Sequence, residues 1–145
     1  MRELGHADSF RDLVVYRKAC SAAQGVFQVT KSFPREEAYS LTDQIRRASR
    51  SIGSQIAEAW AKRRYEKHFV SKLTDADGEQ QETQHWVDIA QSCGYLSEAD
   101  AARLRAELAE IGRMLNSMIR KATLFCRQED RAEESVAEYF VSDSD

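Results

Sequence analysis

The stretch 39–64 constrains the fold most, because its apolar residues recur every three or four positions. Residues at that spacing lie on one face of a helix, whereas a half-buried strand would alternate at every second residue. The apolar face consists of Leu41, Ile45, Ala48, Ser49, Ile52, Ile56, Ala59 and Trp60. The spacing therefore predicts a helix over residues 39–63 with this face buried.

The opposite side of this helix changes character along its length. Arginines come first, and small residues follow at Gly53, Ser54, Ala57 and Ala61. A solvated helix face more often carries Lys and Glu, and small side chains let a second helix approach closely. We therefore predict that these four small residues form an oligomer interface. A monomer with an ordinary surface is the alternative.

Residues that break helices are scarce, which favours long helices joined by short loops. The chain has one proline and six glycines among 145 residues. Apolar periodicity predicts four helices, over residues 12–31, 39–63, 66–92 and 98–126. Pro34 ends the first of these, and Gly94 ends the third as a left-handed cap. No strand pattern competes, so the predicted fold is all-α: an antiparallel up-down-up-down four-helix bundle over residues 1–126.

Two of these helices carry further expectations about burial. In the first helix, the residues expected to face inward are Leu13, Tyr16, Ala19 or Cys20, Ala23, Phe27 and Thr30. In the third helix, Gln80 and Thr83 fall on the apolar stripe, with Glu79 and Glu82 beside them. Its middle is therefore unusually polar for a helix that faces a core.

Cysteine usage and the absence of long apolar runs indicate the compartment. Cys20, Cys93 and Cys126 are widely spaced and form no CxxC pair, which predicts buried, reduced thiols. The first ten residues contain no apolar signal core, and no apolar run approaches the roughly 20 residues that span a bilayer. We expect a cytoplasmic protein without a membrane partner.

Charge is distributed unevenly, although the net charge of the chain is only −3. Residues 127–145 hold two basic and seven acidic residues, which predicts an acidic, flexible tail. Basic residues concentrate in the second helix and the turn after it. The candidate nucleic-acid-binding residues are Arg46, Arg47, Arg50, Lys62, Arg63, Arg64 and Lys67. Clustered Lys and Arg suit phosphates, and Tyr65 could stack on a base. The alternative is a solvated face with intramolecular ion pairs.

No catalytic or metal-binding pattern emerges. Glu82-x-x-His85 has the spacing of a di-metal ligand pair, but such a site needs a second copy and two further glutamates. The carboxylates from Asp75 to Glu82 are expected to pair with arginines of the neighbouring helix rather than to form a catalytic pair. Phosphate-binding loops and nucleophile elbows are absent. We therefore expect no enzymatic activity, metal or cofactor.

Several short motifs, in their order and spacing, resemble a known family over residues 10–119. They are Phe10-Arg11-Asp12-Leu13, Thr30-Lys31-Ser32-Phe33-Pro34, Gln44-Ile45-Arg46-Arg47-Ala48, Ile56-Ala57-Glu58 and Gly94-Tyr95-Leu96. The chain is similar to the four-helix-bundle proteins first noticed as open reading frames in intervening sequences of bacterial 23S ribosomal RNA genes. It departs from their pattern at Gln55, where asparagine is usual, and at Ala59, where glycine is usual.

The resemblance implies an antiparallel bundle that assembles as a ring-like homopentamer, with no established biochemical role. The accessory variability protein of diversity-generating retroelements has a similar architecture. It is a basic pentamer that contacts a reverse transcriptase and nucleic acid. Residues and resemblance together predict a non-enzymatic oligomeric scaffold that binds RNA or DNA through the basic residues of the second helix and the following turn. The alternative is a protein–protein adaptor that binds no nucleic acid.

Overall fold

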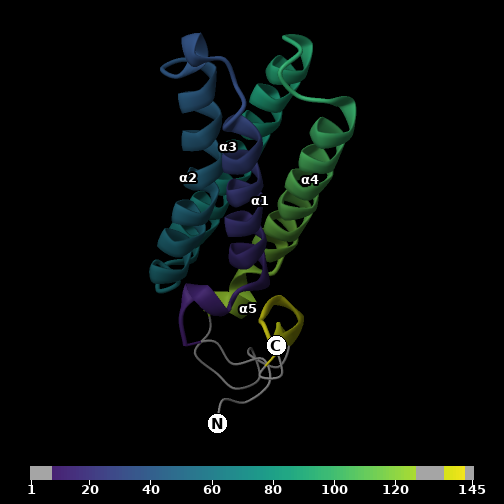
Figure 1. The fold of residues 1–145 in the computed structure, drawn as a ribbon. Helices are drawn as coiled ribbons and strands as arrows, with labels where there is room; N and C mark the ends of the chain where they lie inside the picture. Colours follow the sequence, from purple (N-terminus) through teal and green to yellow (C-terminus); the bar gives the residue numbers. More distant parts are fainter. Residues whose placement is uncertain (1–7, 127–135, 143–145) are drawn as a thin grey trace.

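The computed structural model describes residues 8–126 and 136–142. Four long helices dominate: α1 (Val14–Thr30), α2 (Leu41–Ala61), α3 (Glu66–Ser92) and α4 (Glu98–Arg120). The shorter elements are α5 (Ala122–Cys126) and the 3₁₀ helices η1 (Phe10–Asp12), η2 (Arg35–Glu37) and η3 (Ala137–Tyr139). The long helices lie side by side in Figure 1, which confirms the predicted all-α bundle. Within the described ranges, every helix is too short or too polar to cross a lipid bilayer.

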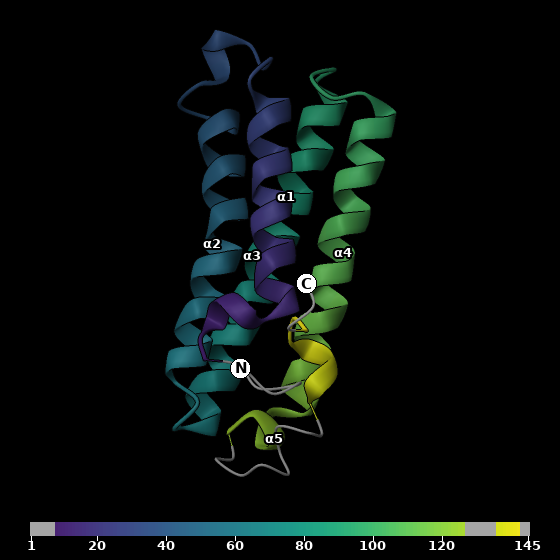
Figure 2. The same ribbon diagram turned by 60° about the horizontal axis from the view of Figure 1, so that its bottom comes forward.

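Cross-helix contacts show how neighbouring helices run. Glu58 near the end of α2 pairs with Lys72 near the start of α3, with Oε2 and Nζ 2.9 Å apart. Arg47, earlier in α2, approaches Glu82, later in α3, at 3.7 Å. The two helices are therefore antiparallel. Figures 1 and 2 show the α1–α2 and α3–α4 connections at one end of the bundle, and η1, η3 and the α2–α3 turn at the other.

Local signals set the helix ends much as the sequence predicts. Gly94 has a φ of 80°, the left-handed conformation that ends α3. The Ser97 hydroxyl accepts a hydrogen bond from the Asp100 amide at 3.0 Å and caps α4. The predicted fourth helix, by contrast, is interrupted at Lys121, and α5 follows. This break brings Phe125 under the bundle, where its ring stacks 5.7 Å from that of Phe69.

The predicted inward face of α1 is wrong in part. The buried residues of α1 are Val15, Ala19, Ala22, Val26 and Thr30. Tyr16, Ala23 and Phe27 are only half-buried, and Cys20 is exposed. The helix carries two adjacent apolar stripes, and the narrower side chains of Val15, Ala22 and Val26 occupy the core. The bulkier stripe is left along the flank beside α2.

The prediction of buried thiols is wrong for two of the three cysteines. Cys20 lies on the exposed flank of α1, and Cys93 is exposed where α3 ends. Cys126 is partly buried, and this burial raises the pKa of its thiol. Sequence spacing locates a cysteine on a helix, but the rotation of that helix decides its exposure.

The polar middle of α3 is accommodated inside the bundle by hydrogen bonds. Gln80 and Thr83 are buried. The Thr83 hydroxyl donates to the Glu79 carbonyl, and Gln80 Nε2 donates to Asp77 Oδ1, each at 2.8 Å. Gly112 of α4 provides the space, because a Cβ there would lie 2.6 Å from Gln80 Nε2. A buried polar group that keeps its hydrogen bonds costs little stability.

Residues 136–142 pack against the open end of the bundle, unlike the flexible tail that the sequence predicts. The buried residues are Val136, Tyr139, Phe140 and Val141. The Val141 amide donates to the Asp12 carbonyl at 2.8 Å, and Phe140 forms an antiparallel bridge with Leu13. This short apolar cluster is visible in the sequence, but the many acidic residues around it favour the prediction of a flexible tail. The rest of the predicted tail lies outside the described residues.

Candidate nucleic-acid and subunit interfaces

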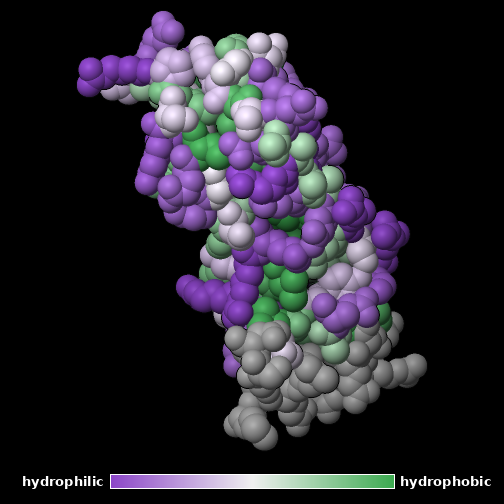
Figure 3. All heavy atoms as spheres, turned by 45° about the vertical axis from the view of Figure 1, so that its right-hand side comes forward, coloured by the Kyte–Doolittle hydropathy of each residue, from purple (hydrophilic) through white to green (hydrophobic). Residues whose placement is uncertain are grey.

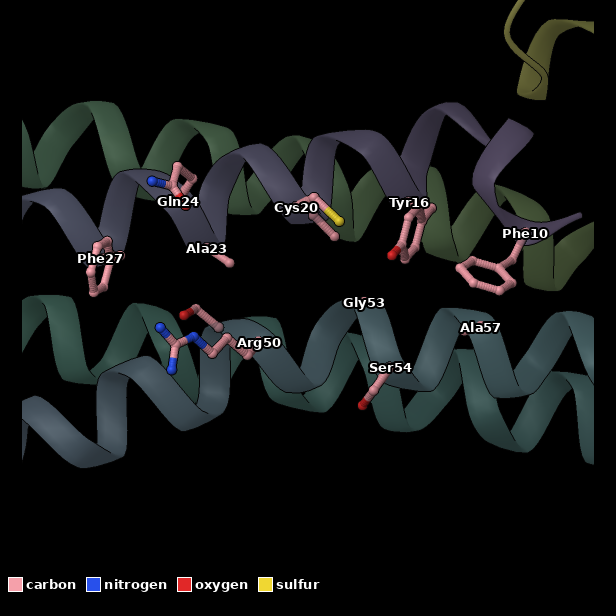
Figure 4. A pocket seen from close by; sticks show the side chains of 12 residues that line it. Phe10, Tyr16, Cys20, Ala23, Gln24, Phe27, Arg50, Gly53, Ser54 and Ala57 are labelled. Carbon is pink, nitrogen blue, oxygen red and sulfur yellow. The ribbon is translucent and has the colours of Figure 1, made fainter.

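A groove of about 430 Å³ runs between α1 and α2. We call it the α1–α2 groove. Its main lining residues are Tyr16, Cys20, Ala23 and Phe27 of α1 and Arg50, Gly53, Ser54 and Ala57 of α2. Figure 4 shows the side chains of Tyr16, Ala23 and Phe27 directed toward α2 across the groove. The groove thus combines the half-buried apolar flank of α1 with three of the four small residues predicted to form a subunit interface.

The predicted interface residues occupy different positions around this groove. Gly53 is buried at its floor, where an added Cβ would contact the Tyr16 ring at 3.5 Å. Its predicted outward orientation is wrong, because α1 of the same chain already packs there. Ser54 is exposed and Ala57 half-buried along the rim, while Ala61 is exposed beyond the groove. The small side chains of Ser54 and Ala57 at the rim leave room for another helix.

Tyr16 gives the groove a polar edge. A hydrogen bond with the Cys20 thiol, followed by burial, raises the pKa of the Tyr16 phenol. The Phe10 ring packs edge-on against Tyr16, with centroids 4.8 Å apart. The end of the groove near Phe10 is therefore aromatic. The Tyr16 hydroxyl and the Cys20 thiol are the polar groups there that a partner could contact.

Two predicted nucleic-acid-binding arginines surround the aromatic ring at the other end of the groove. The guanidinium carbons of Arg46 and Arg50 lie 4.9 and 5.7 Å from the centroid of the Phe27 ring, and Lys31 Nζ lies at 4.9 Å. Arg46 Nε also donates to the Thr30 hydroxyl at 2.8 Å. These cation–π contacts and the hydrogen bond hold the cations against α1.

Arg47 is held by different partners. One of its terminal nitrogens donates to Gln44 Oε1 at 2.9 Å and lies 3.7 Å from Glu82. This is one of the ion pairs predicted between α2 and the carboxylates of α3. We call Arg46, Arg47 and Arg50 the arginine cluster. A shallow depression of about 530 Å³ lies against these three residues.

The remaining predicted basic residues lie at the turn between α2 and α3, at the lower left of Figure 1. We call this site the α2–α3 corner and define it by Lys62, Arg64, Tyr65, Lys67 and His68. All five side chains are exposed. At 1.5 Å of rise per residue, about 18 Å of helix separates Arg50 from Lys62. The basic residues therefore form two sites rather than the single patch that the sequence indicates.

Arg63 has a structural role at this end of the molecule. Its guanidinium carbon lies 3.5 Å from the centroid of the Trp60 ring, and its Nε donates to the Trp60 carbonyl at 2.9 Å. The Trp60 ring also packs edge-on against Phe140, with centroids 6.0 Å apart. Arg63 is therefore fixed against the core, whereas its neighbours extend into solvent.

The residues of the Glu82-x-x-His85 motif contact Trp86 rather than a metal site. Glu82 Oε2 accepts a hydrogen bond from Trp86 Nε1 at 3.1 Å, and the His85 ring lies 4.7 Å from that of Trp86. Among the described residues, no three side chains of His, Cys, Asp or Glu are grouped to hold a metal ion. Figure 3 shows hydrophobic atoms gathered in two recessed patches, one in the upper part of this face and one lower down, with hydrophilic side chains around them.

Comparison with known proteins identifies the family to which the chain belongs. The model of the 23S rRNA-intervening sequence protein family matches residues 11–117. The chain belongs to this family. The match ends within α4, so α5 and residues 136–142 lie outside the part shared with the family model. No protein with a curated description shows significant similarity.

A solved structure supports the same assignment. It is the crystal structure of a protein with unknown function from the S23 ribosomal protein family of Bacteroides thetaiotaomicron VPI-5482. The two chains share 27% identity with a TM-score of 0.68. The match covers 74% of this chain and 96% of the other. Membership of the intervening-sequence family therefore accounts for the helical bundle. The biochemical role of this chain has to be argued from the residues on its surface.

Proposed function

We propose that this intervening-sequence family protein is a non-enzymatic, cytoplasmic scaffold that assembles into a homopentamer and binds RNA or DNA. The observation that carries the proposal is the α1–α2 groove. Its aromatic and small side chains stay accessible on a bundle whose core is already filled. An accessible apolar surface of this kind is typical of a protein–protein contact.

A second copy of the chain suits this groove. Ser54 and Ala57 allow a helix to pack closely over α2, while Tyr16 and Phe27 offer large apolar area. A contact between this face and a different face of the next copy would be heterologous, and a closing rotation then generates a ring. The resemblance to ring-forming bundles favours five copies.

Binding of nucleic acid would follow from repetition of the exposed cations. One α2–α3 corner offers only a few basic side chains, too few for strong binding by a protein with a net charge of −3. In a ring, each copy adds another corner, so weak contacts combine through avidity. Affinity should then fall steeply as salt concentration rises, because each neutralised phosphate releases counterions.

Light scattering coupled to size exclusion tests the assembly. We expect the wild-type protein to elute with the mass of an oligomer. Ser54→Lys should reduce that mass, because the exposed position tolerates lysine in the monomer but places a long charged side chain in the contact. The matched control is Ala102→Lys, at an exposed position of α4, which should leave the mass unchanged. A monomeric wild-type protein would contradict the proposal.

Gel mobility shifts of RNA and DNA at low and high salt test the second part. Charge reversal by Arg64→Glu with Lys67→Glu should weaken binding. The control pair Arg103→Glu with Arg113→Glu changes the net charge equally on α4, where both side chains are exposed. Intact assembly without any shift would instead support a protein–protein adaptor.

A further inference from the structure

We infer that the α2–α3 corner binds single-stranded nucleic acid, with a base stacked on Tyr65 and the adjoining phosphates held by Arg64 and Lys67. The inference rests on the proposed nucleic-acid binding and specifies its location and the form of the strand. A shallow depression of about 820 Å³ lies beside these three residues, with His68 and Val70 also lining it.

Tyr65 has the properties of a stacking platform. Its side chain is 59% exposed, although most large hydrophobic side chains of the described chain are buried. Its backbone is fixed: the amide donates to the Lys62 carbonyl at 3.0 Å, and its carbonyl accepts from the amides of His68 and Phe69 at 3.0 Å each. The ring lies 5.3 Å from that of His68. An exposed ring on an ordered backbone loses little conformational freedom when a base stacks on it.

The cations of the corner remain available for phosphates. No salt bridge among the described residues involves Lys62, Arg64 or Lys67. The charge of Lys62 does act on Glu58, whose pKa is lowered mainly by Lys72 and further by Lys62. By contrast, Lys72 on the next turns of α3 is paired with Glu58, and this contact raises the pKa of the lysine. Glu66 lies beside the depression, so the three cations leave a local excess of positive charge.

The geometry favours a single strand over a duplex. Bases inside a duplex are already stacked on one another, and only an unpaired base offers its face to a protein ring. A duplex would instead be bound through an extended row of phosphate contacts. The arginine cluster is poorly suited to extend such a row of phosphate contacts. Arg46 and Arg50 already contact the Phe27 ring, and Arg47 lies near Glu82.

The test compares a labelled 15-nucleotide single-stranded DNA with the same sequence as a duplex, by fluorescence anisotropy on the full chain. We expect tighter binding of the single strand. Tyr65→Ala should weaken that binding about 5- to 150-fold, which corresponds to the roughly 1–3 kcal/mol lost with one stacked base, while Tyr65→Phe should retain it. Tyr39→Ala is the matched control, because Tyr39 is 97% exposed in the α1–α2 connection at the opposite end.

The outcomes separate this inference from the proposal beneath it. Equal affinity for duplex and single strand, unchanged by Tyr65→Ala, would overturn the inference and leave general nucleic-acid binding intact. Failure of both DNA probes, and of the single-stranded RNA of the same sequence, to bind at low salt would overturn both. Weakening by Tyr65→Ala and Tyr39→Ala alike would also count against the corner. Circular dichroism of each variant checks that the bundle is folded.

Discussion

Glu79 is a charged residue that the bundle accommodates poorly. One of its carboxylate oxygens, Oε2, is buried without a hydrogen-bond partner in the described structure. Burial, and then the neighbouring charge of Glu82, raise the pKa of Glu79, and Arg47 offsets this only in part. The ionised form of Glu79 is therefore disfavoured in the folded protein.

This arrangement predicts that Glu79→Gln stabilises the protein at neutral pH, by up to about 1 kcal/mol. A raised pKa in the folded state means that the penalty of ionised Glu79 is fully present above that pKa. The penalty disappears as the pH falls below the value of an unfolded glutamate, near 4.3. Urea unfolding at pH 8 and pH 4 should show the gain only at pH 8. Glu107→Gln on α4 is the control, and an equal gain at both pH values would contradict the explanation.

Two adjacent arginines show what the sequence alone could not predict about the candidate nucleic-acid interface. Arg63 and Arg64 are adjacent and chemically identical, so composition assigns both to a phosphate-binding patch. The structure separates them, because Arg63 folds back onto Trp60 while Arg64 remains exposed. Gly94 and Ser97, in contrast, were predictable, because a left-handed cap and an N-cap depend on local backbone chemistry alone.

Among the elements, both ends of α3 were predicted at the correct residue. For α1, the sequence did not predict which side of the helix faces the core. Apolar side chains on α1 fill two neighbouring stripes, one through Val15, Ala22 and Val26, the other through Tyr16 and Phe27. The periodicity of the sequence identifies both stripes, but it does not show which of the two is buried in the core. The choice depends on the space left by α2 and α4, which is a property of the packed bundle.

The C-terminal segment 136–142 is the element that most extends the predicted fold. Phe140→Ala should lower the free energy of unfolding by about 3 kcal/mol, because its ring is buried against Trp60 and Phe125. The matched control is Glu138→Gln in the same segment. Glu138 is exposed and pairs with Lys121 at 3.1 Å, so its loss should cost less than about 1 kcal/mol. Chemical denaturation of both variants gives the comparison, and equal stability would mean that the segment does not hold the bundle end.

For the whole molecule, assembly through the α1–α2 groove predicts a difference between two exposed thiols. Cys20 lines the groove, while Cys93 lies at the α3–α4 end, away from it. Modification of Cys20 by a thiol reagent should slow as protein concentration rises and copies associate, whereas that of Cys93 should stay constant. Mass spectrometry of labelled peptides measures both rates in one sample. A Cys20 rate independent of concentration would show that the groove stays open.

At this scale the bundle was predictable because each long helix carries its own apolar periodicity, and local caps mark the end of α3 and the start of α4. The sites were not, because they combine residues from different helices. No pattern within α2 indicates that Gly53 faces Tyr16, or that the groove joins the flank of α1 to the rim of α2.

The contacts of residues 136–142 also determine what a shortened chain would expose. All four long helices precede residue 136, whereas Phe140 packs against the rings of Trp60 and Phe125. A chain cut before residue 136 would therefore keep the helices of the bundle but expose these two rings. Such a chain should aggregate or bind a chaperone more readily than the full chain.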